Sequence, residues 1–185
     1  MRIKGLNDEL IKQYITESLL ILMESKPFNK ITIAQITEKA GVNRSSYYRH
    51  FDTKEDIIGF YLLSIMNEYI EKHRRNGKPD FPSYILQMFQ TFYEHRHDLL
   101  LIHQNGLTYL LLDVLNDCFR FDEITSSSDT DRQYEAAYHI GGIYNDMLLW
   151  MNHKMTETPE QMTASVLSFH PDGTFTILNA HETSS

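Results

Sequence analysis

The sequence predicts an all-α protein with a small three-helix N-terminal domain and a larger all-α C-terminal domain. Apolar residues recur at helical spacing along most of the 185 residues, whereas the alternating pattern typical of strands is scarce. Only eight glycines and five prolines interrupt the chain. A chain of this length can bury a sizeable core, in one long domain or two small ones.

A first helix is predicted from about residue 8 to residue 24. Asn7 can cap it, and Asp8 and Glu9 carry the negative charge that a first helical turn favours. The dipeptide Lys26-Pro27 ends it, because proline cannot continue a helix. Its apolar face consists of Leu10, Tyr14, Ile15, Leu19, Leu22 and Met23.

Residues 30–52 predict two short helices joined by a tight turn. Thr32 and Gln35 have the spacing of a capping box, in which two side chains satisfy the free N–H groups of a helix start. Gly41 stands at the reversal, where positive φ is needed, and Asn43 can cap the second helix. This is a helix-turn-helix, whose second helix enters the major groove of DNA.

The second short helix carries many side chains that bond phosphates and base edges. Arg44 can read guanine with two hydrogen bonds, whereas the hydroxyls of Ser45 and Tyr48 more often hold phosphates. Tyr47 is expected to face the small core instead. The alternative is that these residues form a solvated helix face and cap the helix, without contacting DNA. The polar set comprises Asn43, Arg44, Ser45, Ser46, Tyr48, Arg49 and His50.

The net charge of −8 argues against nucleic acid when it is taken alone. The distribution of charge reverses that conclusion, since residues 1–59 hold nine lysines and arginines against eight acids. Between Lys26 and Lys54 there are six basic residues and only two acids, Glu38 and Asp52. A local basic patch on an acidic body would direct one end of the protein to DNA.

The remaining chain predicts a connecting helix over 53–75, opened by Thr53 with Asp56, and then a run of further helices. Pro82 suits the first turn of the helix that follows. These helices are predicted over about 82–95, 97–103, 106–120, 131–154 and 158–169, with a polar loop over 122–130. The domains expected are 1–52, the connecting helix 53–75, a regulatory and dimerisation domain 76–170, and a tail 171–185. The tail lacks helical periodicity, so it is expected to be extended or disordered, and its TFTIL stretch could pair as an edge strand.

The N-terminal pattern resembles the TetR family of bacterial transcriptional regulators, over roughly residues 8–70. The matching positions are Thr32, Ile36, Ala40, Gly41, Val42, Tyr48, His50, Phe51, Lys54 and Ile58, while Asn43 stands in the usual Ser or Thr place and Thr37 replaces a small residue. The resemblance implies phosphate contacts at Tyr48, His50 and Lys54, and a further contact at Thr32. The C-terminal stretches HRHDLLLIHQNGLTYLLLDVL and YHIGGIYNDMLLWMNHKMTETPEQM are similar to the subgroup of dihydroxyacetone-kinase regulators.

The family resemblance also implies an effector pocket and a four-helix dimer interface in the C-terminal domain. Aromatic walls with a few hydroxyls would suit a small organic effector, although helix-spaced aromatics can equally fill a core. The candidate pocket residues are Phe89, Phe92, Tyr93, His103, Tyr109, Tyr134 and Tyr138, with Tyr144 beside them. Mid-helix glycines are unfavourable unless another helix approaches closely, either from a partner or within the monomer. The candidate interface residues are Gly141, Gly142, Tyr144, Met147, Trp150 and Met151.

Other functions have weaker support in the sequence. His95, His97 and His103 could bind zinc, but the spacing of the first two places them on different sides of a helix. No nucleophile elbow or phosphate-cradling glycine loop is present, so we expect neither an enzyme nor a cofactor. The single cysteine, Cys118, suits a reducing cytoplasm. No signal peptide is visible and no apolar run approaches the ~20 residues that span a bilayer, so no membrane association is expected.

The sequence therefore predicts a cytoplasmic, homodimeric DNA-binding regulator. The family resemblance implies a repressor, since repression is the usual outcome in that family. It would bind double-stranded DNA at a palindromic operator and answer to an unknown small-molecule effector. The alternatives are a zinc-responsive sensor using His95, His97 and His103, and a dimeric interaction protein that has lost DNA binding.

Overall fold

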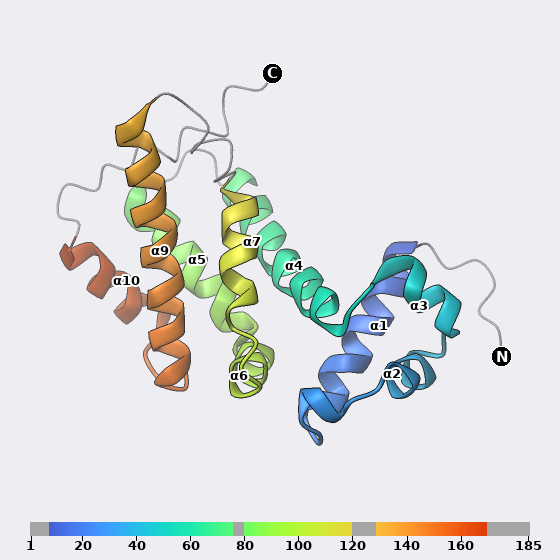
Figure 1. Ribbon diagram of the computed structural model, residues 1–185. Helices are drawn as coiled ribbons and strands as arrows, with labels where there is room; N and C mark the ends of the chain where they lie inside the picture. The colour runs from blue at the N-terminus through green and yellow to red at the C-terminus, as the bar shows by residue number, and fades with distance from the viewer. Residues whose placement is uncertain (1–7, 76–79, 120–128, 170–185) are drawn as a thin grey trace. The chain divides into compact units, whose positions relative to one another are not determined.

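The computed structural model describes residues 8–75, 80–119 and 129–169 (Figure 1). These residues form nine α-helices and one 3-10 turn, and no strand lies among them, which confirms the predicted all-α class. With the labels of Figure 1, the helices are α1 (Asp8–Met23), η1 (Phe28–Lys30), α2 (Ile33–Ala40), α3 (Arg44–His50), α4 (Lys54–Arg75), α5 (Phe81–Glu94), α6 (Arg96–Gln104), α7 (Leu110–Cys118), α9 (Thr130–Asn152) and α10 (Pro159–Phe169).

The chain divides into two compact units, and each unit is assembled from two separate stretches of sequence. Unit 1 consists of Met1–Ser64 and His97–Leu110, whereas unit 2 consists of Ile65–Arg96 and Leu111–Ser185. The long helix α4 therefore begins in unit 1 and ends in unit 2. The stretch from His97 to Leu110 belongs with the N-terminal helices, although it is far from them in sequence.

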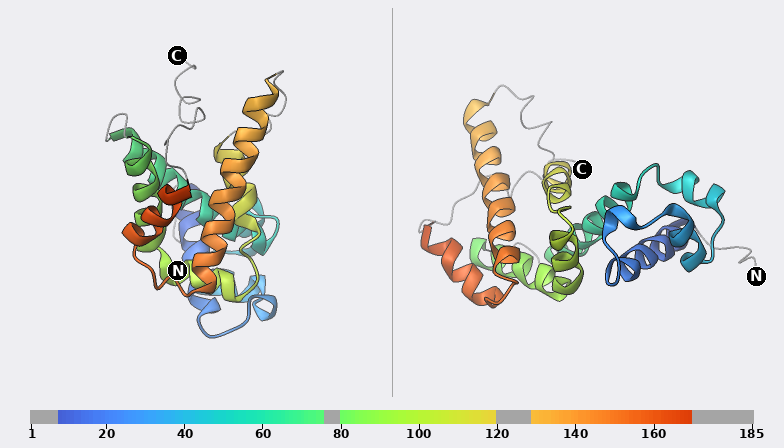
Figure 2. Two further views of the ribbon diagram at one scale, coloured as in Figure 1. Left: turned by 90° about the vertical axis from the view of Figure 1, so that its left-hand side faces the viewer. Right: turned by 60° about the horizontal axis from the view of Figure 1, so that its bottom comes forward.

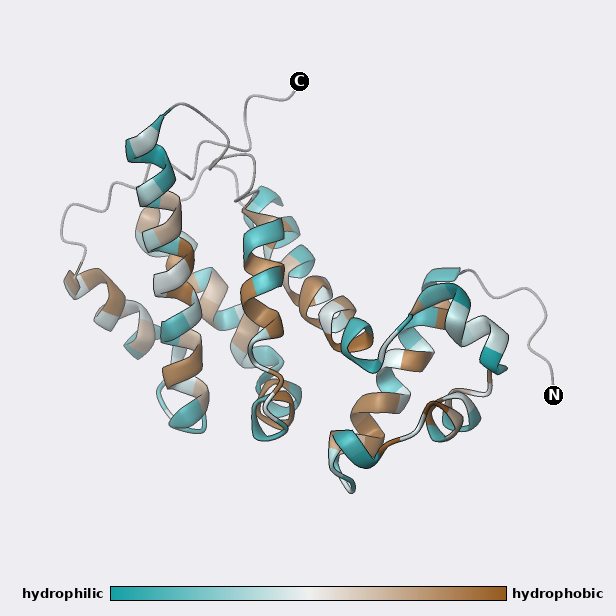
Figure 3. Ribbon diagram, viewed as in Figure 1, coloured by the Kyte–Doolittle hydropathy of each residue, from teal (hydrophilic) through white to brown (hydrophobic). Residues whose placement is uncertain are grey.

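Unit 1 is built on α1, which packs against both α2 and α3. The apolar side of α1 is visible in Figure 3 as hydrophobic segments along that helix. Ile15 and Leu19 of α1 are fully buried, as are Ile36 of α2 and Tyr47 of α3. Removing this apolar area from water is the main stabilising contribution to the small domain.

Unit 2 has an aromatic core in which α5 packs against α10 (Figure 2). Trp150 of α9 is completely buried, edge-on to Phe89 with ring centroids 5.5 Å apart and stacked on Tyr93 at 5.8 Å. Its indole Nε1 donates a hydrogen bond to the carbonyl oxygen of Glu157 at 3.1 Å. The tryptophan thus fixes the turn between α9 and α10 on α5, with its one polar group satisfied.

The main difference from the predicted elements lies after α6. The helix predicted over 106–120 begins only at Leu110, because Gly106 has a φ of +74° and ends the preceding helix. The Gly106 N–H donates to the carbonyl of His103, and the Leu107 N–H donates to that of Ile102. Such bonds are typical of a helix C-terminus closed by a left-handed glycine.

Several sequence predictions lie partly or wholly outside the described residues. These are the Asn7 cap, the boundary segment 76–79, the loop predicted over 122–130 and the tail 171–185. The predicted domain boundaries at residues 52, 75 and 170 stay predictions. None of the described helices has the length and apolar character that crossing a membrane requires.

Candidate DNA interface and regulatory region

The turn between α2 and α3 has the geometry that the sequence predicts. The Thr32 hydroxyl accepts the backbone N–H of Gln35 at 3.3 Å, and the Gln35 side chain accepts the Thr32 N–H at 3.0 Å, which completes the capping box. Gly41 has a φ of +67° and closes α2 in the left-handed region. Lys26 donates to the same Gln35 oxygen at 2.9 Å, so a basic side chain also secures the start of α2.

Asn43 caps α3 and orders the polar residues at its start. Its Oδ1 accepts the Ser46 N–H at 2.7 Å and the Ser45 hydroxyl at 2.6 Å. A helix of seven residues is too short to be stable alone, so this cap and the burial of Tyr47 must hold it in place. Asn43 and Ser45 therefore have a structural role that exists before any DNA contact.

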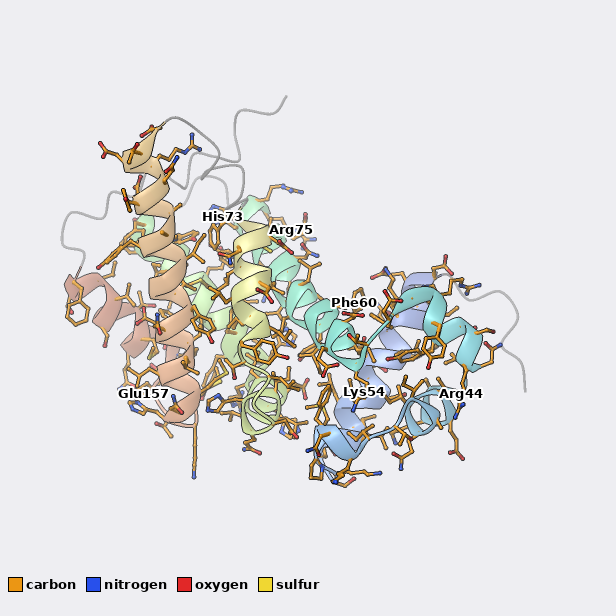
Figure 4. All side chains as sticks on the ribbon, viewed as in Figure 1. Arg44, Lys54, Phe60, His73, Arg75 and Glu157 are labelled. Atoms are coloured by element: carbon orange, nitrogen blue, oxygen red, sulfur yellow. The ribbon has the colours of Figure 1, made fainter. Side chains whose placement is uncertain are left out.

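The outward face of α3 presents charged and aromatic groups to solvent. Arg44 is exposed at the first turn (Figure 4), and within the described residues its guanidinium has no hydrogen-bond or ion-pair partner. Tyr48, which lies one turn further along, is 56% exposed, and its ring meets the edge of Tyr47 with centroids 5.2 Å apart. An unengaged guanidinium beside an aromatic hydroxyl is suited to base edges and phosphates.

The end of α3 is tied to the start of α1 by charge. Arg49 lies 3.4 Å from the carboxylate of Asp8, and the imidazole Nε2 of His50 lies 3.6 Å from the same oxygen. The His50 side chain is only 5% exposed, whereas those of Arg49 and Asp8 are mostly exposed. Arg49 can therefore exchange its weak, solvated ion pair for a phosphate, but His50 is placed to support the helix end.

Lys54 lies at the start of α4 and is engaged with the backbone. Its ammonium donates to the carbonyl oxygens of Phe28 at 2.7 Å and Ile31 at 2.9 Å, and it lies 4.3 Å from the centre of the Phe28 ring (Figure 4). Burial lowers the pKa of Lys54 below its ordinary value. The residue that the family resemblance assigns to phosphate thus also fixes the segment before α2.

The candidate effector residues do not form one group. Phe89, Phe92, Tyr93, Tyr134 and Tyr138 belong to unit 2, whereas His103 and Tyr109 belong to unit 1. Phe89 and Phe92 lie in the unit 2 core, while Tyr134 and Tyr138 are 74% and 64% exposed on α9. His103 is within 3.0 Å of the Thr108 hydroxyl, and Tyr109 is exposed.

The described part of unit 2 has concave surfaces of different character. An apolar groove of about 150 Å³ lies among α5, α9 and α10, lined by Phe81, Ile85, Met88, Phe89, Tyr138, His139, Gly142, Ile143, Asp146, Val166 and Phe169. Small-molecule sites usually enclose about 300–1,000 Å³, so this groove is small for an effector. A polar groove of about 310 Å³ is lined by Lys72, Arg75, Gln87, Gln90, Thr91 and Glu94.

A buried polar pair beside the apolar groove is absent from the predicted set. The Tyr84 hydroxyl of α5 and Nε2 of His139 of α9 are 3.1 Å apart, and both side chains are buried. Burial raises the pKa of Tyr84, so it stays a neutral phenol. Helical periodicity places both residues on inward faces, but it cannot show that they meet across 55 positions.

The three histidines of the zinc hypothesis have separate partners. His95 lies 2.8 Å from Glu68, His97 lies 3.6 Å from Glu24, and His103 contacts Thr108. Glu68 also binds Lys72 at 2.7 Å. Although burial raises the pKa of Glu68, hydrogen bonds from Lys72 and His95 outweigh that effect and leave it lowered. No group of three metal-ligating side chains converges anywhere in the described ranges.

The candidate dimer residues divide between core and surface of unit 2. Met147, Trp150 and Met151 are buried within the chain. The solvent face of α9 instead carries Tyr134, Tyr138, Gly142, Asn145 and Leu149, at helical spacing. A Cβ added at Gly141 or Gly142 would meet nothing within 4 Å among the described residues, so close packing against those residues does not account for the two glycines.

Fold and site together define a helix-turn-helix DNA-binding regulator. The sequence pattern described as "Bacterial regulatory proteins, tetR family" matches residues 15–59, and that of a "Transcriptional regulator C-terminal region" matches residues 80–170. The chain belongs to the TetR family of bacterial transcriptional regulators, as the sequence predicted. Members of this family are DNA-binding regulators. Comparison with curated protein sequences finds no match.

Several solved structures share the fold at low sequence identity. The dihydroxyacetone kinase operon activator DhaS is 15% identical, with a TM-score of 0.55 over 86% of this chain and 93% of its own. FadR of Thermus thermophilus, a repressor in complex with lauroyl-CoA, is 14% identical, with a TM-score of 0.55 and coverage of 89% and 95%. FadR of Bacillus subtilis in complex with stearoyl-CoA is 17% identical, with a TM-score of 0.55 and coverage of 88% and 99%.

Proposed function

We propose that this protein is a dimeric repressor that binds a palindromic operator and is released from it by a small organic effector. The observation that carries the proposal is α3, a capped helix that presents the exposed side chains of Arg44 and Tyr48 beside a basic α2 start. Two copies would place their α3 helices in successive major grooves, about one helical turn apart.

The surroundings of each side chain on and around α3 indicate its role in DNA binding. Arg44, which has no hydrogen-bond or ion-pair partner among the described residues, is the base reader, and Tyr48 with Arg49 holds phosphates. Thr32, Asn43, Ser45 and Ser46 shape the helix starts, and their hydroxyl O–H and amide N–H groups can donate further hydrogen bonds to phosphates. His50 acts mainly by supporting the end of α3, and Lys54 by fixing the segment before α2, with any phosphate contact secondary.

The effector is proposed to bind in unit 2, where the apolar groove is lined by Phe89 and Tyr138 and bordered by His139 and Asp146. Its size of about 150 Å³ means that binding of a larger molecule must open it. Acyl-CoA thioesters are the first compounds to screen, because two proteins of similar fold are described in complex with them. An effector lowers operator affinity only by as much as it prefers the conformation that binds DNA poorly.

The test is selection of bound fragments from random duplex DNA by the purified protein at near-physiological salt. An enriched inverted repeat is expected, with half-sites about one helical turn apart. No enrichment would instead favour the interaction protein that has lost DNA binding.

Arg44→Ala is then expected to relax the preference at one base position in each half-site and to weaken operator binding by about 1–3 kcal/mol. Arg75→Ala is the matched control, since Arg75 is an exposed arginine of unit 2. Equal operator binding by Arg44→Ala and Arg75→Ala would show that Arg44 does not read a base. Addition of acyl-CoA to the operator complex tests the proposed effector class in the same assay.

A further inference from the structure

The backbone N–H and C=O of Phe28 are each hydrogen-bonded to a residue far away in the sequence. Its N–H donates to Oδ1 of Asn105 at 2.9 Å, and its carbonyl oxygen accepts the ammonium of Lys54 at 2.7 Å. The Phe28 ring is buried beneath the same ammonium. We refer to Asn105, Phe28 and Lys54 as the Phe28 clamp.

The side chain of Asn105 is oriented for this contact by its own helix end. Its Nδ2 donates to the carbonyl of Leu101 at 2.9 Å, so Oδ1 is the atom that faces Phe28. The reverse orientation would set a donor against the Phe28 N–H, which makes the assignment of the amide unambiguous. Gly106 then turns the chain away with a φ of +74°.

Two further contacts attach the segment His97–Leu110 to the rest of unit 1. The Tyr61 hydroxyl donates to Asp98 at 2.7 Å, and His97 lies 3.6 Å from Glu24. The second pair is largely exposed and contributes little. The side chain of Asn105 is hydrogen-bonded to Phe28, in the segment immediately before α2.

The location of the Phe28 clamp connects it with DNA recognition. Phe28 begins η1, and Ile31, the C-cap of η1, adjoins Thr32, the N-cap of α2. Lys54 also binds the Ile31 carbonyl, so both ends of η1 are fixed. A change in this short segment alters where α2 begins, and α2 is the helix against which α3 packs.

We propose that Asn105 is a positioning residue for operator binding, which holds the Phe28 peptide, and thereby the start of α2, in the arrangement that presents α3 to DNA. This inference rests on the proposed function, because it assigns Asn105 a role in that same interface. Asn105 acts through the peptide and not through a DNA contact. Both ends of the segment His97–Leu110 continue by peptide bonds into unit 2, so a displacement there has a covalent route to the clamp.

The test compares Asn105→Ala with Thr108→Val in the full-length protein. Thr108→Val is the matched control, because it removes the contact between Thr108 and His103 in the same segment without touching η1. Hydrogen exchange of the free proteins is measured at the amides of Phe28, Lys30 and Ile31. Asn105→Ala is expected to accelerate exchange there, whereas Thr108→Val leaves it at the wild-type rate.

Operator binding is measured for the same proteins over a series of salt concentrations. Asn105→Ala is expected to raise the operator Kd about five- to tenfold, as the loss of one partly buried hydrogen bond predicts. The slope of log Kd against log salt should stay at the wild-type value, since no phosphate contact is lost. Thr108→Val should bind the operator with the wild-type Kd, even if its melting temperature falls by as much as that of Asn105→Ala.

Each arm can overturn the inference. Unchanged exchange at Phe28 in Asn105→Ala would show that Asn105 does not hold the peptide. Faster exchange with an unchanged operator Kd would show that the clamp does not position α3, and a smaller salt slope would make Asn105 a direct phosphate contact. If the wild-type protein binds no duplex, the proposed function fails, while the exchange measurement still decides on the clamp.

Discussion

The side chain of Tyr47 lies wholly inside unit 1, although it belongs to the helix that is expected to read DNA. Its hydroxyl is buried and has no hydrogen-bond partner among the described residues. Burial, assisted by the nearby charge of Asp56, raises its pKa from 10.0 to about 12. The ring therefore serves packing, and the hydroxyl is an unfavourable addition to it.

Tyr47→Phe is expected to increase the free energy of unfolding by about 1 kcal/mol at pH 7, because it removes an unsatisfied buried group and keeps the ring. Between pH 10 and 12 the unfolded chain ionises while folded Tyr47 keeps its proton, so the wild-type protein loses stability as pH rises. The variant should lose less over that window. Denaturant unfolding at pH 7 and pH 10.5 measures both effects. A variant less stable than wild type at both pH values would mean that the hydroxyl has a partner in solution.

The short helix α3 depends on its cap more than a long helix would. Asn43→Ala is expected to lower the free energy of unfolding by about 1 kcal/mol, because it leaves the Ser46 N–H without its acceptor. Operator affinity should fall more steeply than stability, since fraying begins where Arg44 stands. Asn43→Ser is the control, because serine keeps a neutral capping oxygen. Binding curves and thermal melts of the two variants would conflict with this account if alanine and serine behaved alike.

Local signals in the sequence predicted the DNA-binding helices well. The capping box of Thr32, the left-handed Gly41 and the cap at Asn43 each depend on residues at most three positions apart, and all three are confirmed. The burial of Tyr47 follows from helical spacing in the same way. Short-range spacing is therefore sufficient where a structure is determined by its own neighbours.

The arrangement of the C-terminal helices has no comparable local signal, because it depends on contacts between distant residues. Periodicity places Phe89 and Tyr138 on their helices, but it does not reveal that His103 and Tyr109 belong to the other unit. Periodicity also cannot distinguish an aromatic residue that fills a core, such as Trp150, from one that contacts an effector or a second chain. The contact of Asn105 with Phe28 spans 77 positions and has no local signal at all.

For the assembly of two chains, the solvent face of α9 is the most informative surface. Leu149 is 55% exposed there, in line with Tyr138 and Gly142. The two glycines cost about 1 kcal/mol each relative to alanine, and no close packing within the described residues compensates for them. Contact with the same face of a second chain would supply that compensation.

Leu149→Glu is expected to convert a dimer into a monomer, because a two-fold interface would bury the new charge twice. Losing the burial of two leucine side chains should raise the dimer Kd by at least about a hundredfold. Ile21→Glu is the control, since Ile21 is similarly exposed, at 47%, on α1 of unit 1. Sedimentation or light scattering measures the mass. A dimer that survives Leu149→Glu would place the interface elsewhere, and a monomeric wild type would contradict the proposal of a dimer.

The assembly of unit 1 from two stretches of sequence has a consequence for its synthesis. On the ribosome the helix-turn-helix emerges first, but Asn105 and its helix end follow more than fifty residues after Lys54. The hydrogen bond between the Phe28 N–H and Asn105 can therefore form only after Asn105 has been synthesised. Closing the loop between these two residues carries an entropic cost. The nascent chain thus completes the unit that holds the helix-turn-helix only after α5 and α6 have been made.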